Sequence, residues 1–155
     1  MKLNLKTEKR KFFETIQRAV VYEEADEDGI CTCISCGKKG LIRDFDGGHG
    51  FSKGYNIKLA RVRNNIHAQF HYCNRMLAGN QLRWFQGVQD RYGAEEYELL
   101  MLLDRASNGN KEALAELPED LKESLSKKWT AEDYRKERLK WQAIIERNRE
   151  KERRL

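Results

Sequence analysis

The sequence predicts an α+β fold in which a small metal-pinned core of strands and a helix is flanked by an N-terminal helix and a C-terminal helical region. The chain has 155 residues, which is one domain's worth, and it combines 35% charged residues with a single proline, a balance typical of helix-rich proteins. Helical periodicity dominates both ends of the chain. Between them, a glycine-rich stretch with a Cys-x-x-Cys pair is typical of a metal-binding turn beside short strands.

The first element is a predicted helix over residues 7–22. Phe12, Ile16 and Val20 recur four residues apart and form one apolar stripe. The acidic run EEADEDG at residues 23–29 then breaks the pattern and is predicted to be a loop.

The stretch from Ile30 to about Phe51 is predicted to be a metal-binding turn that leads into a β-hairpin. Its CISCG turn is followed by LIRDF, in which apolar and polar residues alternate, and by the glycine-rich DGGHG. Residues 52–63 are predicted to be a basic loop. A short helix is then expected from about Phe70 to Leu77.

The remaining chain is predicted to be helical. A helix capped by Asn80 is expected to bury one face, formed by Leu82, Phe85, Val88 and Tyr92. A second helix is expected over residues 94–103, and the last helix begins at Thr130, whose hydroxyl can accept a hydrogen bond from the amide of Asp133. We therefore divide the chain into an N-terminal part, a core and a C-terminal helical region, at residues 1–29, 30–93 and 94–155.

The charge distribution predicts a nucleic-acid-binding face in the core. The net charge is +5, and no Asp or Glu occurs between Asp46 and Asp90, whereas six Lys and Arg residues do. A basic segment without acids suits a polyanion, because phosphate contacts release condensed counterions. On charge alone, a solvated basic surface explains the segment equally well. We select Arg61, Arg63 and Arg75 as the expected phosphate contacts.

The expected location is the interior of the cell that makes the protein. No run of about 18 apolar residues is present that could span a membrane, and the N-terminus MKLNLKTEKRKFF lacks the apolar stretch of a signal peptide. Three of the four cysteines lie within six residues. In a reducing compartment such clustered thiols more often bind a metal than form disulfides.

The cysteine spacing predicts a structural zinc site. Cys33 and Cys36 are separated by two residues, so both sulfurs can face one ion. The pair alone is a weak signal, because a redox pair or two buried thiols have the same spacing. Cys73 is the expected third ligand. The fourth is either His71, which we favour because it lies near Cys73 where a second knuckle would form, or Cys31. The zinc would join the hairpin to the following helix.

His49 is the candidate for acid–base chemistry. It follows two glycines and precedes a third, so a phosphodiester backbone can approach its imidazole closely. A lone histidine in a turn more often has no chemical task. The same acid-free segment, however, also contains Asn65, His67 and Asn74 as further polar groups.

A series of motifs resembles a known protein family. The motifs are CISCG (33–37), DGGH (46–49), NIHAQ (65–69), CN (73–74), AGN (78–80), RYG (91–93) and WTAED (129–133). Their order and spacing resemble those of the lambdoid-phage NinG/Rap recombination proteins, and more distantly the zinc cysteines and the following asparagine resemble phage T4 endonuclease VII. The resemblance implies a zinc-pinned ββα-metal (HNH-like) core. It also implies a metal-dependent, structure-selective DNA endonuclease that acts on branched recombination intermediates such as Holliday junctions, D-loops or flaps.

The resemblance implies roles for single residues as well. His49 would act as general base on a water molecule, and Asn65 would hold the His49 ring or its backbone in place. Asn74 and Asp46 would bind a catalytic Mg²⁺ or Mn²⁺. Asp46 would replace the acidic residue that many HNH enzymes have where this chain has Gly48.

Phe70 is a second departure from the expected pattern, and one alternative function is open. Phe70 stands where the family has the first cysteine of a second pair, so either His71 or Cys31 completes the zinc site or zinc binding is weakened. His67 is expected to have a supporting role. The implied partners are branched or double-stranded DNA, phage recombination proteins and a second copy of the chain, in the cytoplasm of the host cell. The alternative is a non-catalytic zinc-knuckle module that binds DNA or recruits a recombination protein.

Overall fold

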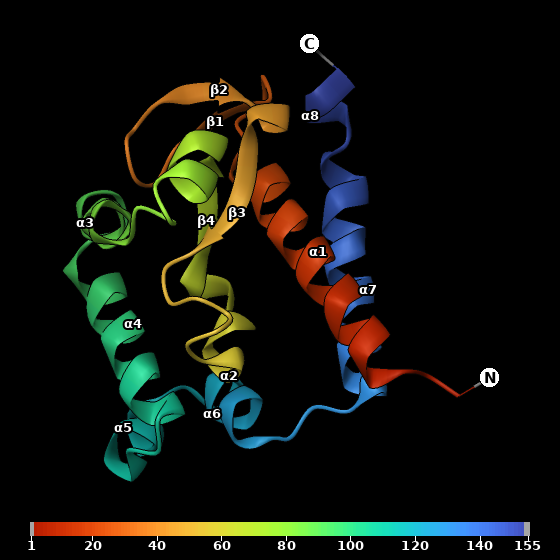
Figure 1. Ribbon diagram of the computed structural model, residues 1–155, viewed down its shortest axis with the longest axis vertical. Coiled ribbons are helices and arrows are strands. Elements are labelled where there is room, and N and C mark those ends of the chain that lie inside the picture. Colours follow the sequence, from red (N-terminus) through yellow and green to blue (C-terminus); the bar gives the residue numbers. More distant parts are fainter. Residues whose placement is uncertain (1, 154–155) are drawn as a thin grey trace.

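A computed structural model describes residues 2–153 as a mixture of helices and two small antiparallel sheets (Figure 1). The elements in chain order are α1 (Leu5–Glu24), β1 (Ile30–Thr32), β2 (Lys39–Leu41), β3 (Phe45–His49), α2 (Ile57–Ala60), β4 (Ile66–Phe70), α3 (Gln81–Tyr92), α4 (Ala94–Ser107), α5 (Lys111–Glu116), α6 (Glu119–Ser126), α7 (Ala131–Asn148) and α8 (Glu150–Arg153). A π-helical turn, Tyr72–Met76, follows β4 in place of the longer helix expected there. The predicted α+β class is confirmed.

The two strand pairs are β1–β2 and β3–β4, both antiparallel. The prediction that β3 belongs to a hairpin within residues 30–51 is wrong. Its partner is β4, which follows residues 50–65, and His49 lies opposite Ile66. The physical reason is a 3₁₀ turn at Ile42–Asp44, which interrupts the alternating stretch before β3 begins. The metal-binding turn is therefore the tip of β1–β2 alone.

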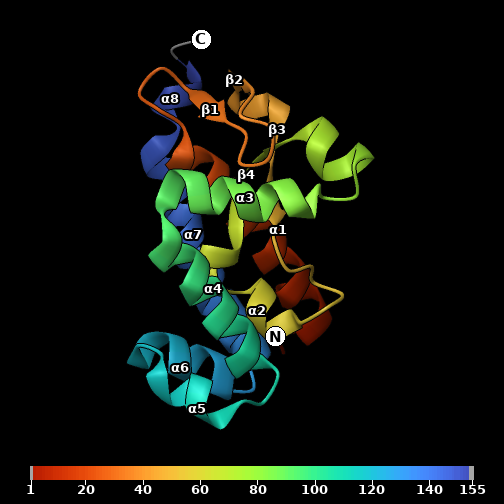
Figure 2. The ribbon, with the colours of Figure 1, turned by 90° about the vertical axis from the view of Figure 1, so that its left-hand side faces the viewer.

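Helix α1 lies against the β3–β4 pair on one side and against α7 on the other (Figures 1 and 2). The predicted stripe of Phe12, Ile16 and Val20 is fully buried, which confirms the amphipathic pattern. Tyr134 of α7 packs edge-on against Phe12, with ring centroids 5.5 Å apart. The N-terminal helix is thus an internal support of the strands that carry the candidate site.

Helix α3 buries a different face from the one expected. Leu82 is 85% exposed, whereas Trp84 is fully buried beside Val88. The turn before the helix sets this register, because Ala78 and Asn80 both have positive φ angles, 49° and 44°. Asn80 stands at the start of the helix but its side chain does not cap it.

The C-terminal helices form a second apolar cluster, to which α4 contributes Leu100 and Leu103 and α6 contributes Leu125. The predicted start of the last helix is confirmed, since Thr130 and Asp133 form a reciprocal capping box. Within residues 2–153, no helix is both long enough and apolar enough to cross a membrane.

The basic stretch expected as a loop after β3 contains the short helix α2. Asn56 caps this helix by accepting hydrogen bonds from the amides of Lys58 and Leu59, at 3.0 and 3.3 Å. Leu59 and Ala60 are fully buried, so α2 is anchored in the core. It therefore holds the stretch between β3 and β4 in one place.

Candidate functional site

The backbone around His49 is held by side chains from α1 and α3. The bonds run from Gln17 to the carbonyl of Gly47 at 2.8 Å, from Trp84 to that of Gly48 at 3.1 Å, and from Gln81 to that of Gly50 at 2.9 Å. We did not predict these three donors, because each lies at least 30 residues from its acceptor. Their effect is to fix the position of His49 before any ligand binds.

The same glycines are required by close packing. A Cβ atom at Gly47 would overlap the backbone of Gln17, one at Gly48 would overlap the side chain of Gln69, and one at Gly50 would overlap the Trp84 ring. This packing explains why no acidic residue stands directly before His49. A carboxylate has no room at Gly48 while Gln69 keeps its place.

His49 is oriented by a backbone carbonyl. Its Nε2 lies 3.0 Å from the carbonyl oxygen of Ala60, and since a carbonyl only accepts hydrogen bonds, Nε2 carries the proton of the neutral ring. Burial, together with the positive charge of Lys53, lowers the pKa of His49 to about 4 against the opposing effect of the Ala60 bond. At neutral pH the imidazole is therefore uncharged and its Nδ1 has a free lone pair, as a general base requires.

Asn65 joins the loop after His49 to α2. It is fully buried, accepts from the Phe51 amide at 2.7 Å, and donates to the carbonyls of Phe51 at 2.9 Å and Leu59 at 3.3 Å. Leu59 immediately precedes Ala60, which binds the His49 ring. Asn65 therefore ties the backbone on both sides of the imidazole into one unit.

Asp46 is held as a carboxylate by its neighbours. It accepts hydrogen bonds from Asn74 at 3.0 Å and from Arg75 at 2.7 and 2.9 Å, and the Nε2 atom of His71 lies 3.3 Å away. Burial alone would raise the pKa of Asp46, but the bonds from Arg75 and Asn74 outweigh it and hold the pKa below its usual range. The carboxylate of Asp46 and the amide oxygen of Asn74 are hard donors of the kind that Mg²⁺ and Mn²⁺ prefer.

Two neighbouring cavities open on these groups. His49 and Lys53 line one of about 330 Å³, and Asp46 and Arg75 line another of about 370 Å³. Asn74 lines both cavities. The structure therefore brings His49, Asp46 and Asn74 to one region of the surface, with a basic side chain in each cavity.

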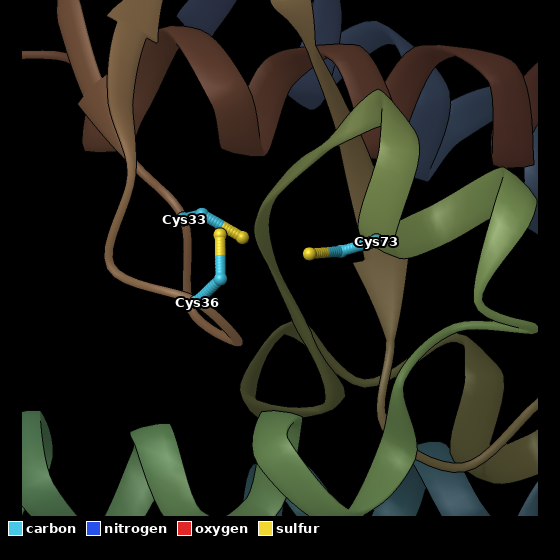
Figure 3. A group of neighbouring side chains, drawn as sticks. All are labelled: Cys33, Cys36 and Cys73. Atoms are coloured by element: carbon cyan, nitrogen blue, oxygen red, sulfur yellow. The ribbon is translucent and has the colours of Figure 1, made fainter.

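The three predicted zinc cysteines come together (Figure 3). Cys33 and Cys36 approach from the turn between β1 and β2, Cys73 approaches from the π-helical turn, and all three sulfur atoms lie within 4.8 Å of one another. With Zn–S bonds of about 2.3 Å, two sulfurs on one tetrahedral zinc lie about 3.8 Å apart. This soft, closely spaced donor set can bind a metal such as zinc.

The protein favours a thiolate at one of these sulfurs. Burial raises the pKa of Cys33, but backbone N–H groups directed at its sulfur, led by that of Phe70 at 3.3 Å, outweigh burial and lower it. Burial and the neighbouring cysteine sulfurs raise the pKa of Cys73 to about 12. Three thiolates therefore share this site only if a cation compensates their charge.

Neither candidate for the fourth zinc ligand lies in the cluster. The imidazole of His71 is beside Asp46, because β4 runs to Phe70 and the chain then turns away. Cys31 is fully buried, its sulfur is 3.5 Å from the carbonyl of Val21, and burial raises its pKa to about 12. Among the described residues, the metal-binding group consists of the three cysteines only.

Two of the arginines selected as phosphate contacts are engaged within the fold. Arg61 is buried, lies 4.2 Å from the ring centroid of Trp129 and donates to the carbonyl of Ser124. Arg63 forms ion pairs with both Glu23 and Glu24 at 2.9 Å. Unlike Arg75, neither lines the cavities of His49 and Asp46.

His67 lies away from these cavities and inside the structure. Its Nδ1 is 2.6 Å from Glu24, its ring stacks on Tyr92 with centroids 4.6 Å apart, and its ring centroid is 5.3 Å from that of Trp84. Glu24 also accepts from the Ala68 amide at 2.7 Å. His67 thus belongs to the packing that joins α1, β4 and α3.

Comparison with known proteins gives one match. A family model described as "Bacteriophage Lambda NinG protein" matches residues 1–152. No curated protein and no solved structure matches significantly. The matched range includes the cysteine cluster and every residue of the two cavities. The chain therefore belongs to the bacteriophage lambda NinG family, and this membership supports a role related to phage recombination.

Proposed function

We propose that this protein is a metal-dependent DNA endonuclease that acts on branched recombination intermediates. The observation that carries the proposal is the state of His49, a neutral imidazole whose Nε2 is bound to the Ala60 carbonyl. The ring lines a cavity together with Asn74, and Asn65 holds the backbone around it. An oriented, uncharged base beside oxygen donors suits hydrolysis of a phosphodiester.

In the proposed reaction, Nδ1 of His49 removes a proton from a water molecule. The water oxygen bonds to phosphorus, the bond from phosphorus to the 3′ oxygen breaks, and the departing 3′ oxygen takes a proton from solvent to become a hydroxyl. The imidazolium that forms keeps its Nε2–H bond to the carbonyl of Ala60, which orients the ring throughout. Lys53 lines the same cavity and provides positive charge for a phosphate. A Mg²⁺ or Mn²⁺ held by Asp46 and Asn74 would supply further positive charge at the phosphate and the departing oxygen.

A zinc ion bound by Cys33, Cys36 and Cys73 would have a structural task in this proposal. It would join the β1–β2 turn to the π-helical turn, which contains Cys73. Asn74 is the next residue along the chain, so fixing the sulfur of Cys73 also fixes the amide of Asn74. Zinc binding would thereby position a ligand of the catalytic cation.

The second candidate function is a non-catalytic zinc-knuckle module that binds DNA or recruits a recombination protein. One observation favours it: both carboxylate oxygens of Asp46 are bonded to the Arg75 guanidinium. Arg75 must leave this carboxylate before Asp46 can bind a cation. A protein in which Arg75 stays in place would bind DNA without cutting it.

A cleavage assay tests the proposal. Purified protein is mixed with labelled four-way junction, flap and linear duplex DNA, with and without Mg²⁺ or Mn²⁺, in parallel with His49→Ala. We expect metal-dependent cutting of the branched substrates, slower by at least about a hundredfold in the variant. Zinc content, thermal unfolding and junction binding of the variant serve as controls for its fold.

Two results would count against the endonuclease. Cleavage by His49→Ala at the wild-type rate would remove the general-base role. Tight binding of branched DNA by the wild type without cutting under either metal would favour the non-catalytic module instead.

A further inference from the structure

An exposed apolar surface lies on the segment that leads from β4 into α3. Of the eight large apolar side chains that residues 2–153 leave exposed, four stand here: Tyr72 at 56%, Met76 at 72%, Leu77 at 44% and Leu82 at 85%. Figure 2 shows this yellow-green segment projecting from the side of the molecule, above the start of α3. Such a concentration of apolar surface marks an interaction site more often than single exposed residues do.

The segment is ordered although it is exposed. Its π-helical turn is followed by Ala78, Gly79 and Asn80, all with positive φ angles. Gln69, which is fully buried, donates to the Gly79 carbonyl at 2.6 Å, and the Gly79 amide donates to the carbonyl of Asn74 at 3.1 Å. The apolar side chains therefore stand on a fixed turn of a kind often found at functional sites.

The position and the charge of the segment identify its partner. Asn74, Ala78 and Gly79 line the cavity of His49, so the apolar surface adjoins the candidate active site. Arg83 is exposed among the apolar residues, Arg75 is exposed there and paired with Asp46, and no Asp or Glu occurs from residue 47 to residue 89. An apolar surface with basic and no acidic neighbours in sequence suits a polyanion that also offers apolar faces.

We propose that the side chains of Tyr72, Met76, Leu77 and Leu82 pack against unstacked bases at the branch point of a DNA junction. Stacked base pairs hide their faces in a linear duplex, whereas a branch exposes them to aromatic and aliphatic side chains. Arg83 would contact a flanking phosphate, and Arg75 would do so after leaving the carboxylate of Asp46. This inference rests on the proposed function, and it explains how a nuclease of this kind would select branched over linear DNA.

Binding measurements without added divalent ions test the inference apart from cleavage. The ligands are a four-way junction, with 2-aminopurine at the branch, and a linear duplex of the same sequence. The test variant is Met76→Ser/Leu82→Ser, and the matched control is Leu5→Ser/Leu139→Ser, which alters two leucines of 48% and 52% exposure on other helices. We expect the test variant to lose about tenfold in junction affinity, with duplex affinity and melting temperature unchanged.

For the wild type and the control we expect a rise in 2-aminopurine fluorescence on junction binding, and a smaller rise for the test variant. An unchanged ratio of junction to duplex affinity in the test variant would overturn the inference, as would failure of the wild type to bind DNA. A shift from dimer to monomer in the test variant without DNA would assign the surface to self-association and overturn it too. Selective junction binding through these side chains without cleavage would leave the inference intact and refute the endonuclease.

Discussion

The two strand pairs are ordered by different means. β1 and β2 are three residues each, and the turn between them ends in the cysteine cluster that also receives Cys73. β3 and β4 are five residues each and lie between α1 and α3, and side chains of these two helices are bonded to the backbone of β3 (Figures 1 and 2). A metal ion bound by the cysteines would stabilise the β1–β2 pair, whereas packing and hydrogen bonds stabilise the β3–β4 pair.

This difference separates the proposed structural role of the cysteines, at the β1–β2 pair, from the proposed chemical role of His49, on the β3–β4 pair. His49, the group proposed to do the chemistry, stands on the pair whose backbone is bonded by side chains of α1 and α3. The strand pairs are linked by few bonds, among them the one from the Ile34 amide to the carbonyl of Ala68 at 3.0 Å. We therefore expect each pair to respond to different perturbations.

The largest effect is expected from loss of the metal. In Cys73→Ser, or after chelation of zinc, amide exchange across residues 30–41 should accelerate by about a thousandfold, because zinc sites of this kind contribute several kcal/mol of folding energy. Exchange in β3 should change by less than about tenfold. Hydrogen exchange followed by mass spectrometry measures both. Equal acceleration in the two strand pairs would show that they unfold as one unit.

Removing the Asn65 amide should act on the second pair. Asn65→Ala leaves the amide and the carbonyl of Phe51 without partners, whereas the Leu59 carbonyl keeps its bond from the Val62 amide. We therefore expect a loss of about 4 kcal/mol in the free energy of unfolding. The control is Asn64→Ala, which removes one bond to Glu96 and should cost under about 1 kcal/mol. Urea denaturation compares the two. A cost for Asn65→Ala no larger than that of the control would contradict this account.

Acid should also weaken the second pair through His49. Its pKa of about 4 in the folded protein lies below the usual value of 6.5, so the unfolded chain binds a proton that the folded chain does not. This contribution is present above pH 6.5 and is lost as the pH falls toward 4, by about 3 kcal/mol in total. We expect His49→Gln to lack this pH-dependent contribution to the free energy of unfolding, as measured by urea denaturation at pH 4.5 and pH 7. Parallel curves for the variant and the wild type would show that His49 is not buried as described.

The smallest effect is expected at Gly48. A Cβ there overlaps the side chain of Gln69, so Gly48→Ala should cost about 2 kcal/mol in the free energy of unfolding. Gly54→Ala is the matched control, because no atom lies within 4 Å of an added Cβ and the residue has an ordinary φ angle. The free energy of unfolding of Gly54→Ala, measured by thermal unfolding, should lie within about 0.5 kcal/mol of the wild-type value. Equal stability of the two variants would show that β3 has more room than the structure indicates.

Much of the fold could be predicted from local patterns. The stripe of α1, the Thr130 cap and the meeting of Cys33, Cys36 and Cys73 follow from periodicity, capping chemistry and ligand spacing. Each of these is encoded by residues that are close in sequence or by a strong chemical preference. These features can be predicted without knowing which distant residues the fold brings together.

The rest depended on partners that only the folded chain brings together. In the sequence, Arg63 has the pattern of a basic loop residue. In the folded chain it forms ion pairs with Glu23 and Glu24 at the end of α1. Leu82 was expected inside, but left-handed residues before α3 set the helix so that Trp84 is buried instead. Neither the backbone conformation of that turn nor a contact between distant elements leaves a periodic signal in the sequence.

The packing of α1 against α7 has a consequence for the order in which the protein can assemble. Lys151, just beyond α7, donates to the carbonyl of Tyr22 in α1, although 129 residues separate them in the sequence. Contacts of such long range form late, because a long loop must close first. During synthesis, the apolar face of α1 that packs against α7 therefore stays exposed until α7 has been made. A ribosome-bound chain that lacks α7 should therefore hold β3 loosely.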